Sequence, residues 1–551
     1  MNQGMLTFCL SLDAAQRRMA SFMPSLSGVR RLVGEKDEGR VVPVEEDGAG
    51  LGETYAPDEC ARDCYELARY GGLRRESRHL LRMASDPLEQ SLTELGEALD
   101  EAALELHDKI WAYATATAPR PELGAAVVER GLQTEALRDE IYCQVMALAT
   151  GNPIVRSLDA LWKLFCACAV TFPPSHELAK YCFHFCYTCD KREPRPSHDY
   201  ASFGATAMLG CLEAGAAYAV APSAEDMAAY DERPPCVIAV ELADGSPLAP
   251  RFPVTPQTPA SKVAEILGRV FLQLKDNRAA TFGLFVVADG DSIPLGRSDY
   301  PGDAARGWAP PPHVVYKRLA LFADEPSRSS DATFEMLTYA QAEDAVLNEG
   351  CLPVSDAAAA ELAAFGLAVS LGEDVPTTVD GLLAMEDITI AEFFPPRFEQ
   401  TPPAELAKKA LARLPDPATP LRVLHRSFVD VVKKLDLYGA HFFRARLDAG
   451  HAAQSAAAIE IARRLPDDGV LVAVNALGLW LFDPVDHAKL LDRYARNEVC
   501  SWERPDARVV AVKVQRAGDD AATFVFDDRS PGAAAGLAAS LDAYARPRVK
   551  P

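Results

Sequence analysis

The chain has 551 residues, of which 49% are hydrophobic and 25% are charged, and its formal net charge is −23. That length exceeds what one hydrophobic core can hold and predicts several domains, while the composition is typical of globular protein. The acidic balance argues against nucleic acid as a partner and restricts membrane contact to the peripheral kind, because such a surface repels phosphate groups.

Two further features bear on cellular location. No apolar run approaches the roughly 20 residues that cross a bilayer, and the apolar run at residues 5–10 lacks the basic flank and cleavage pattern of a secretion signal. The 13 cysteines are odd in number and irregularly spaced, which is typical of reduced thiols. These features predict a cytoplasmic protein, and no pattern indicates a cofactor.

Residues 1–75 are predicted to be an N-terminal extension. Short helices are expected at 13–23 and 60–70, and a charged, Gly-rich loop is expected at 35–50. These segments predict no function by themselves.

Residues 76–200 are predicted to form an all-α domain, because apolar residues recur there at helical spacing. Ser85 or Asp86 would cap its first helix ahead of Pro87, which is the usual order of residues at a helix start. Such a run of helices packs as a bundle. The expected helices are 88–98, 102–115, 122–130, 135–149, 157–169 and 175–187.

A linker helix is predicted within residues 201–233, and the periodicity changes after it. Within residues 234–300, the turn Asp244-Gly245 separates two expected strands, which a helix and a third strand follow. Strand, turn, strand, helix and strand in this order predict a ubiquitin-like lobe. The expected strands are 236–242, 251–254 and 282–287, and the expected helix is 260–273.

The remaining chain divides into a helical part, 313–435, and a strand-rich part, 438–546. The helical part opens with an expected strand at 314–322, and its segment 371–403 is rich in proline and acidic residues, as an insertion would be. Its helices are expected at 331–347, 357–370 and 421–435. The strand-rich part has expected strands at 441–447, 470–475, 478–482, 498–503, 509–514 and 523–526, and a closing helix at 533–544.

Four sequence blocks occur in order within the predicted all-α domain. They are Leu137-Arg138-Asp139-Glu140-Ile141-Tyr142-Cys143-Gln144, Gly151-Asn152-Pro153, Leu161-Trp162-Lys163-Leu164 and Phe172-Pro173-Pro174-Ser175. This order resembles the signature of the MyTH4 domain, a helical binding module of certain myosin and kinesin tails. The resemblance implies no catalytic activity. It implies the signature residues Arg138, Asp139, Glu140, Tyr142, Gln144 and Trp162.

The three lobes that follow resemble a FERM domain. The matching segments are Phe282-Gly283-Leu284-Phe285 in the first lobe, residues 337–342 in the second, and Tyr438-Gly439 with Phe524-Val525-Phe526 in the third. A MyTH4 domain followed by a FERM domain is a tail unit of unconventional myosins and plant-type kinesins. The resemblance implies a multidomain α+β fold: an all-α MyTH4 bundle, then ubiquitin-like, helical and PH/PTB-like lobes, the last with a C-terminal helix.

This resemblance implies a non-enzymatic cytoskeletal adaptor. It would bind cytoplasmic tails of membrane proteins or motor proteins through the FERM part, and microtubules or motors through the MyTH4 part. The alternative is the cargo-binding tail of a myosin or kinesin whose motor lies outside this chain. No segment follows the phosphate-loop pattern Gly-x-x-x-x-Gly-Lys-Ser/Thr, so nucleotide hydrolysis by that route is not expected.

The polar residues within 138–144 have two interpretations. They either form an internal hydrogen-bond network, which is favoured, or contact a partner. A group of cysteines with one histidine also has two interpretations, because it could consist of buried thiols or bind zinc. Buried thiols are favoured, because Cys182 and Cys186 lie four positions apart on a helix, in phase with core residues. The group is Cys166, Cys168, Cys182, His184, Cys186 and Cys189.

In the third FERM lobe, Val499-Cys500-Ser501-Trp502 resembles the strand to which family members add a partner peptide. Alternatively, Trp502 packs on the sheet face. Tubulin has acidic tails, and direct binding to it is not favoured, because basic residues are thinly spread in the MyTH4 part. They are Lys109, Arg130, Arg138, Arg156, Lys163 and Lys180, with one local group at Lys191, Arg192 and Arg195.

Overall fold

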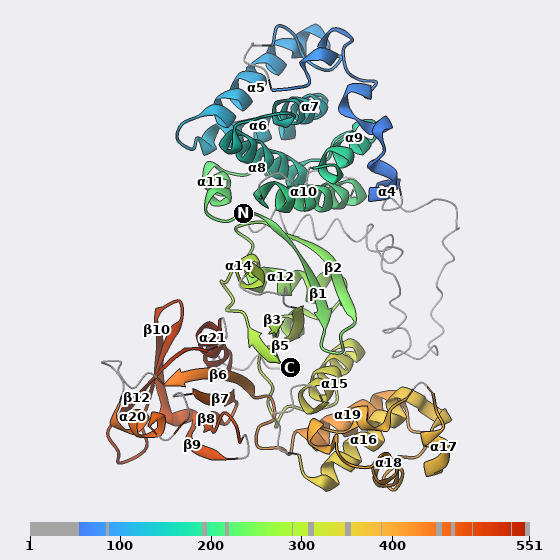
Figure 1. Ribbon diagram of the computed structural model, residues 1–551, viewed down its shortest axis with the longest axis vertical. Helices are drawn as coiled ribbons and strands as arrows, with labels where there is room; N and C mark the ends of the chain where they lie inside the picture. Colours follow the sequence, from blue (N-terminus) through green and yellow to red (C-terminus); the bar gives the residue numbers. More distant parts are fainter. Residues whose placement is uncertain are drawn as a thin grey trace. The chain divides into compact units, whose positions relative to one another are not determined.

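A computed structural model describes residues 54–83, 88–189, 195–214, 220–288, 290–306, 313–347, 354–386, 388–447, 455–463, 465, 469–486, 489–529 and 532–545 (Figure 1). The described residues form two compact units. The first contains the residues up to 238 together with 251–258, and the second contains 239–250 and the described residues from 259 onward. Within these ranges, no helix is long and apolar enough to cross a membrane.

The first unit is built from helices around one hydrophobic core. Local sequence explains several helix starts: Pro121 stands at the first position of α6, Ser175 caps α9 through its hydroxyl, and Ser223 opens α11 with a capping box. The elements are α4 (Pro57–Cys60), η1 (Asp63–Tyr65), η2 (Leu67–Arg69), η3 (Glu76–Leu80), α5 (Glu97–Thr115), α6 (Pro121–Gln133), η4 (Glu135–Leu137), α7 (Arg138–Ala149), α8 (Val155–Thr171), α9 (His176–Tyr187), α10 (Arg195–Ala214) and α11 (Ala224–Glu232).

Residues 54–75 and the helix α10 are part of this core. Tyr55 stacks on Phe183 of α9 with ring centroids 4.9 Å apart, and Tyr70 is buried. On α10, Phe203 and Met208 are fully buried against the same cluster. The predicted domain limits at residue 75 and at 201–233 therefore fall inside one packed body, because apolar residues of both segments face the same helices.

Two predicted helices differ from the structure. The segment 88–95 runs extended, because Thr93 bridges to Leu73 and the Glu140 carboxylate holds the N–H groups of Leu92 and Thr93. The segment 60–70 forms separate short turns, because its two end residues are buried while most residues between them are exposed. The predicted helix at 13–23, the loop at 35–50 and the cap at residues 85–86 lie outside the described residues.

The ubiquitin-like lobe contains a five-stranded sheet in the order β2-β1-β5-β3-β4, with β1 parallel to β5. Gly245 makes the β1–β2 turn at the predicted position, with a φ of 77° that favours glycine. Strand β5 was predicted to open the helical lobe but is the central strand here, and it is almost entirely buried as that place requires. The elements are β1 (Cys236–Leu242), β2 (Pro247–Val254), α12 (Ala260–Ile266), η5 (Leu267–Phe271), α13 (Asp276–Ala279), β3 (Phe282–Ala288), β4 (Asp291–Pro294), α14 (Pro301–Arg306) and β5 (His313–Arg318).

The helical lobe packs α15, α16, α18 and α19 around an apolar core. Ser355 caps α16, which ends at Gly372, where φ is 57°. The proline- and acid-rich segment 371–403 folds as short helices that bury Phe394 and Phe398, so it belongs to the lobe. The elements are α15 (Ala332–Leu347), α16 (Asp356–Leu371), η6 (Gly372–Asp374), α17 (Val379–Leu383), η7 (Ile390–Phe393), η8 (Pro396–Phe398), α18 (Pro403–Leu411) and α19 (Leu421–Val432).

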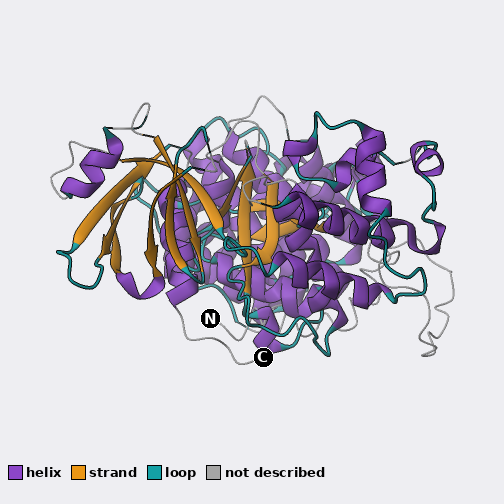
Figure 2. Ribbon diagram, turned by 90° about the horizontal axis from the view of Figure 1, so that it is seen from below, coloured by secondary structure: helices purple, strands orange, loops and turns teal. Residues whose placement is uncertain are grey.

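The third lobe contains one antiparallel seven-stranded sheet in the order β10-β11-β12-β6-β7-β8-β9, covered by the helix α21. Figure 2 shows the strands of the two sheets as separate groups. The edge strand β9 was not predicted, because its sequence Leu-Leu-Asp-Arg-Tyr-Ala is polar and largely unburied. The elements are β6 (His441–Leu447), α20 (Ala456–Ala462), β7 (Gly469–Asn475), β8 (Gly478–Phe482), β9 (Leu490–Ala495), η10 (Arg496–Glu498), β10 (Val499–Asp506), β11 (Val509–Val514), β12 (Ala522–Asp528) and α21 (Ala533–Ala545).

Ion pairs between lobes join the second unit into one body. Lys317 of β5 pairs with Asp344 of α15 at 2.6 Å, and Arg444 of β6 pairs with Asp291 of β4 at 3.1 Å. The architecture is a helical body that ends with α11, followed by a ubiquitin-like lobe, a helical lobe and a seven-stranded sheet with a C-terminal helix. The predicted multidomain α+β class is confirmed.

Candidate protein-binding surfaces

The Glu140 carboxylate lies inside the first unit, where it holds an extended segment of chain. Its side chain is fully buried and accepts hydrogen bonds from the Leu92 N–H (2.9 Å), the Thr93 N–H (2.7 Å) and the Thr93 hydroxyl (2.6 Å). The Gln144 amide donates a fourth bond at 2.7 Å. Four donors offset the cost of burying a charge. Glu140 thereby fixes the path of residues 91–95.

The neighbouring Asp139 ties two other segments to the same helix. Its carboxylate accepts bonds from the Ser175 N–H (2.8 Å) and hydroxyl (2.6 Å), at the start of α9. The Tyr70 hydroxyl donates to it at 3.0 Å. Burial, and then the charge of Asp139, raise the pKa of Tyr70, so this hydroxyl stays a donor. Asp139 therefore joins residue 70 to α9.

Arg138 and Tyr142 face the chain turn between α8 and α9. The Tyr142 hydroxyl donates to the Phe172 carbonyl at 2.8 Å, and the Arg138 Nε donates to the Gly131 carbonyl at 3.1 Å. The Arg138 guanidinium also lies over the Phe172 ring, 5.7 Å from its centroid. Both polar side chains are thus used to anchor neighbouring backbone.

The last two signature residues are also internal. The Gln144 amide donates to the Ala103 carbonyl at 3.0 Å, and Trp162 is buried with its ring stacked on Phe185, centroids 4.6 Å apart. Each of the six predicted signature residues is therefore used in hydrogen bonds or aromatic contacts within the first unit. The geometry corresponds to the internal interpretation, in which the signature builds the domain.

Four of the six residues in the cysteine group are buried. Cys166, Cys168, Cys182 and Cys186 are buried, and burial raises the pKa of each thiol. The His184 Nδ1 donates to the Cys60 carbonyl at 3.0 Å. Among the described residues, no three His, Cys, Asp or Glu side chains are grouped as metal ligands would be.

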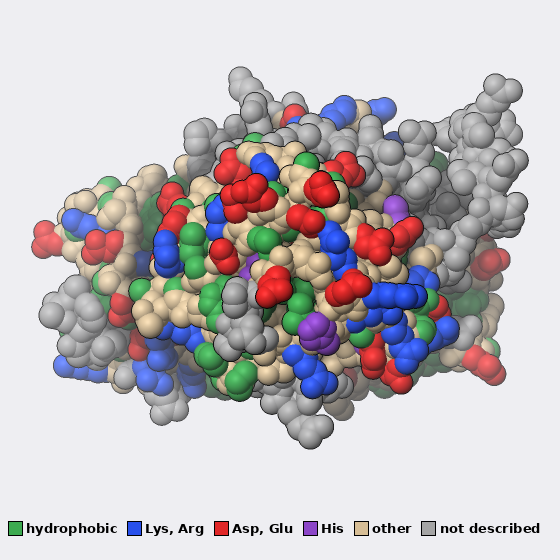
Figure 3. Space-filling view, turned by 90° about the horizontal axis from the view of Figure 1, so that it is seen from above, with side chains coloured by type: hydrophobic (Ala, Val, Ile, Leu, Met, Phe, Trp, Pro, Cys, Tyr) green, Lys and Arg blue, Asp and Glu red, His purple; other side chains and the backbone are tan. Residues whose placement is uncertain are grey.

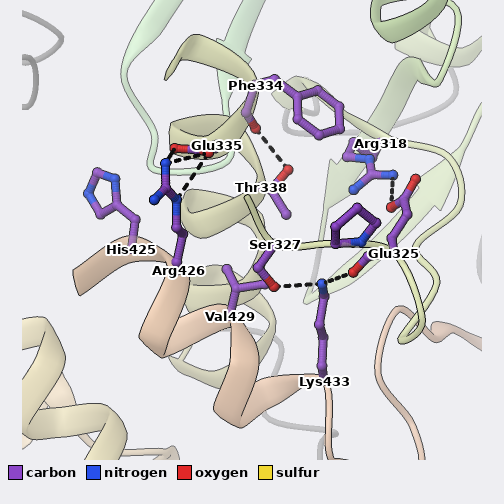
Figure 4. A pocket seen from close by; sticks show the side chains of 11 residues that line it. Arg318, Glu325, Ser327, Phe334, Glu335, Thr338, His425, Arg426, Val429 and Lys433 are labelled. Atoms are coloured by element: carbon purple, nitrogen blue, oxygen red, sulfur yellow. Dashed lines mark hydrogen bonds and ion pairs between the residues drawn. The ribbon is translucent and has the colours of Figure 1, made fainter. Parts of the chain in front are cut away.

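A small polar cavity lies beside α15 and α19 (Figure 4). It offers about 20 Å³, which is room for one water molecule. Its charged side chains pair with one another: Glu335 with Arg426 at 2.9 Å, and Glu325 with Arg318 at 2.6 Å. The cavity therefore serves the packing of these helices and is too small for an organic ligand.

Sheet edges are the places where an extended partner chain adds by backbone hydrogen bonds, and both edges of the ubiquitin-like sheet are blunted. On β2, Pro247, Pro250 and Pro253 each remove an N–H donor. On the opposite edge, β4 is only four residues long and packs against β6 and α21.

The β9 edge of the third lobe is capped by side chains. The Arg493 N–H donates to Asp492 Oδ1 at 2.8 Å, and the Arg493 carbonyl accepts a bond from the Arg516 guanidinium at 2.6 Å. Arg516 also pairs with Asp492, which holds the cap together. Backbone groups in the middle of β9 therefore already have partners.

The β10 edge is open. Within the described part of the chain, the backbone of residues 499–504 bonds to β11 alone. Cys500 and Ser501 are exposed, while Val499 and Trp502 are half-buried. The Trp502 indole N–H donates to Asp542 Oδ1 of α21 at 2.9 Å, and its ring packs against the core of the lobe. The four predicted residues thus lie together on a free edge beside α21 (Figure 1).

A basic surface on the first unit was not predicted. Arg75, Arg78, His79 and Arg82 follow one another on and beside η3, and all four are exposed. The three arginines have no ion pair within the described residues. Figure 3 shows Lys and Arg side chains gathered on one part of the face in view. The run Arg-Arg-Glu-Ser-Arg-His-Leu-Leu-Arg could have indicated a basic surface from the sequence, but it crosses the predicted boundary of the N-terminal extension at residue 75.

The turn between α7 and α8 lies beside this basic segment. The Met83 N–H donates to the Thr150 carbonyl at 3.1 Å, just beyond the last of the three arginines. In the same turn Ile154 and Val155 are 52% and 60% exposed, unusual values for large apolar side chains. The basic surface therefore has an apolar border.

Comparisons with known proteins agree with this architecture. Residues 125–229 match the family model of the MyTH4 domain. The chain is 29% identical over 121 residues to a myosin-I heavy chain of Dictyostelium discoideum, a match that covers 22% of this chain and 5% of that one. It is 24% identical over 363 residues to a kinesin-like protein of Oryza sativa subsp. japonica, covering 58% of this chain and 27% of that one. The chain thus spans only a small part of these relatives.

Solved structures of MyTH4-FERM domains overlap most of the chain. A mutant MF2 domain of Dictyostelium discoideum myosin VII covers 87% of this chain and 99% of its own, with 16% identity and a TM-score of 0.45. The C-terminal MyTH4-FERM domain of human myosin 7b, solved with the harmonin-a PDZ3 domain, covers 86% and 94%, with 20% identity and a TM-score of 0.42.

Residues 125–229, which lie in the helical first unit, are thus similar to the MyTH4 domain. The chain is also similar to parts of a myosin and of a kinesin-like protein.

Proposed function

We propose that this chain is a non-enzymatic adaptor whose FERM part binds protein segments by adding them as a strand to β10. The open backbone edge from residue 499 to residue 504 carries the proposal, because backbone hydrogen bonds supply affinity in this mode of binding. The prolines of β2 and the side-chain cap on β9 support it, since they disfavour addition at those edges. The expected partners are cytoplasmic tails of membrane proteins or of motor proteins.

The basic surface around η3 supports a second activity, binding of acidic protein segments such as the tails of tubulin. Arg75, Arg78 and Arg82 are exposed and unpaired within the described residues, and the chain as a whole carries −23. A localised positive group of this kind attracts acidic segments despite the net charge, and salt weakens the attraction. The protein is expected to work in the cytoplasm, associated with the cytoskeleton.

The alternative is that the chain is the cargo-binding tail of a myosin or kinesin. The small share of its relatives' length that it spans, 5% and 27%, supports this alternative. Both functions use the same surfaces, so the test below serves either.

Two native thiols make the β10 proposal directly testable. Cys500 is exposed on β10, and Cys64 is exposed in the first unit, away from any predicted binding strand. Peptides selected from a random library on the immobilised full chain serve as probes. At saturation they are expected to slow alkylation of Cys500 by iodoacetamide, read by mass spectrometry, while Cys64 reacts at its normal rate. Unchanged alkylation of Cys500 would contradict the proposal.

A further inference from the structure

Trp502 and Asp542 combine an aromatic ring with a negative charge at the open edge. The indole N–H donates to Asp542 Oδ1 at 2.9 Å and links β10 to α21. The ring is half-buried and Asp542 is exposed, so both are reachable by an incoming segment. An aromatic face attracts cations, and a carboxylate beside it adds a full negative charge to that attraction.

Within the described residues, no cation of this chain neutralises the Asp542 carboxylate. Arg504, two positions beyond Trp502 on β10, donates to the Ala507 carbonyl at 3.3 Å and forms no ion pair with Asp542. The open edge therefore presents one carboxylate, that of Asp542, beside the Trp502 indole without an ion pair among the described residues.

The helix α21 carries small side chains on the face that contains Asp542. Ala535, Ala539 and Asp542 occupy positions i, i+4 and i+7, which form one face of a helix. Both alanines are half-buried, and their methyl groups leave room for a long side chain to lie along the helix toward Asp542. A lysine or arginine stem is apolar and suits such a path, while its charged end reaches the carboxylate.

We infer that the segment added to β10 carries a basic residue, whose side chain lies against the Trp502 indole and pairs with Asp542. This inference rests on the proposed function of β10 and names the chemistry of its partner. Arginine is expected ahead of lysine, because the planar guanidinium stacks on an aromatic ring while its fork binds a carboxylate. The β10 edge and the basic surface around η3 therefore select partners of opposite charge.

The variant Asp542→Asn separates charge from structure, because the amide oxygen still accepts the indole N–H. Random peptides are selected on the immobilised full chain, wild type and variant, and sequenced. Wild type is expected to enrich arginine or lysine at one position, and Asp542→Asn is expected to lose that enrichment. Asp520→Asn, which removes an exposed charge from the turn between β11 and β12, is the matched control and should select as wild type does.

A peptide from the wild-type selection then gives an affinity test. Replacing its basic residue by glutamine should weaken binding to wild type about tenfold and binding to Asp542→Asn by much less. The inference is overturned if the selected peptides protect Cys500 without any basic enrichment, or if Asp542→Asn selects the same basic position. Peptides that leave Cys500 unprotected, or a selection without binders, would instead refute the proposed function on which it rests. Unchanged thermal unfolding confirms that each variant is folded.

Discussion

Lys317 of β5 and Asp344 of α15 form an ion pair across two lobes, with 2.6 Å between Nζ and Oδ2, and their side chains are only 5% and 13% exposed. Lys317 also donates to the Ser292 hydroxyl at 3.3 Å. The pair fixes the ubiquitin-like lobe against the helical lobe in a place from which water is largely excluded. Loss of either charge there leaves the other without its main partner.

The first prediction concerns this pair. Lys317→Met is expected to lower the free energy of unfolding by about 3 kcal/mol, because it removes the positive charge that pairs with the largely buried Asp344 carboxylate. The double variant Lys317→Met with Asp344→Leu should recover most of that loss. Arg397→Met, which breaks the exposed pair with Asp356, should cost under about 1 kcal/mol. Calorimetric unfolding measures all four proteins, and equal costs for the two single variants would contradict the account.

Glu140 gives the second prediction. Glu140→Ala removes the acceptor of the Leu92 and Thr93 N–H groups and is expected to cost about 3 kcal/mol or more. Amide hydrogen exchange at Leu92 and Thr93 should accelerate at the same time. Glu135→Ala is the control, because that side chain is 87% exposed and its loss should cost under about 0.5 kcal/mol. If exchange at residues 92 and 93 stayed slow in Glu140→Ala, the carboxylate would not be what holds the segment.

The third prediction is a dependence of stability on pH. Burial, and then the charge of Lys317, lower the pKa of His441 to about 3, and its Nδ1 shares a hydrogen bond with the Ser540 hydroxyl at 2.7 Å. An unfolded histidine has a pKa of about 6.5. Between those values the unfolded chain binds the extra proton, so the contribution of His441 is complete above about pH 6.5 and falls as the pH drops toward 3.

The variant His441→Asn isolates that effect. Its stability should fall less than that of wild type between about pH 7 and pH 5, as read from denaturant midpoints. His425, whose pKa burial lowers to about 4, causes a parallel loss that remains in both proteins. Identical losses in wild type and His441→Asn would show that His441 is not a neutral buried group.

The fourth prediction concerns the basic surface. Replacing Arg75, Arg78 and Arg82 by alanine should weaken binding to a glutamate-rich peptide about tenfold and reduce co-sedimentation with microtubules. The remaining binding should depend less on salt. A control that replaces the exposed Arg62, Arg120 and Arg130 changes the net charge equally and should bind as wild type does. Equal losses of binding in the two triple variants would show that binding depends on net charge and not on the surface around η3.

Helices, strands and turns that are specified by their own residues could be predicted from the local sequence. The turn at Asp244-Gly245, the helix that starts near residue 175 and the apolar strands of the third lobe were all predicted from nearby sequence. Residues 88–95 were mispredicted as helix, because the group that holds them extended, Glu140, lies nearly fifty positions away. Strand β5 was assigned to the wrong lobe, because its parallel pairing with β1 is a long-range relationship that sequence pattern does not display.

At the candidate binding surfaces, too, single segments could be found from the sequence, whereas contacts between distant residues could not. Residues 499–502 were singled out by resemblance, but Asp542 lies forty positions from Trp502 and nothing in the sequence pairs them. The side-chain cap on the opposite edge is also a long-range contact, because Arg516 lies more than twenty positions from the Arg493 carbonyl that it binds. The arginines of η3 were readable as a cluster, yet their significance depends on the segment packing as part of the helical unit, which only the structure shows.

Amide hydrogen exchange of the full chain with and without a saturating library-selected peptide tests the central claim, that β10 is the edge to which a partner strand adds. Slower exchange is expected for amides within 499–504 in the complex, and unchanged exchange is expected within 490–495 on the capped edge. Protection confined to β9, or a bound peptide that leaves β10 exchange unchanged, would contradict it.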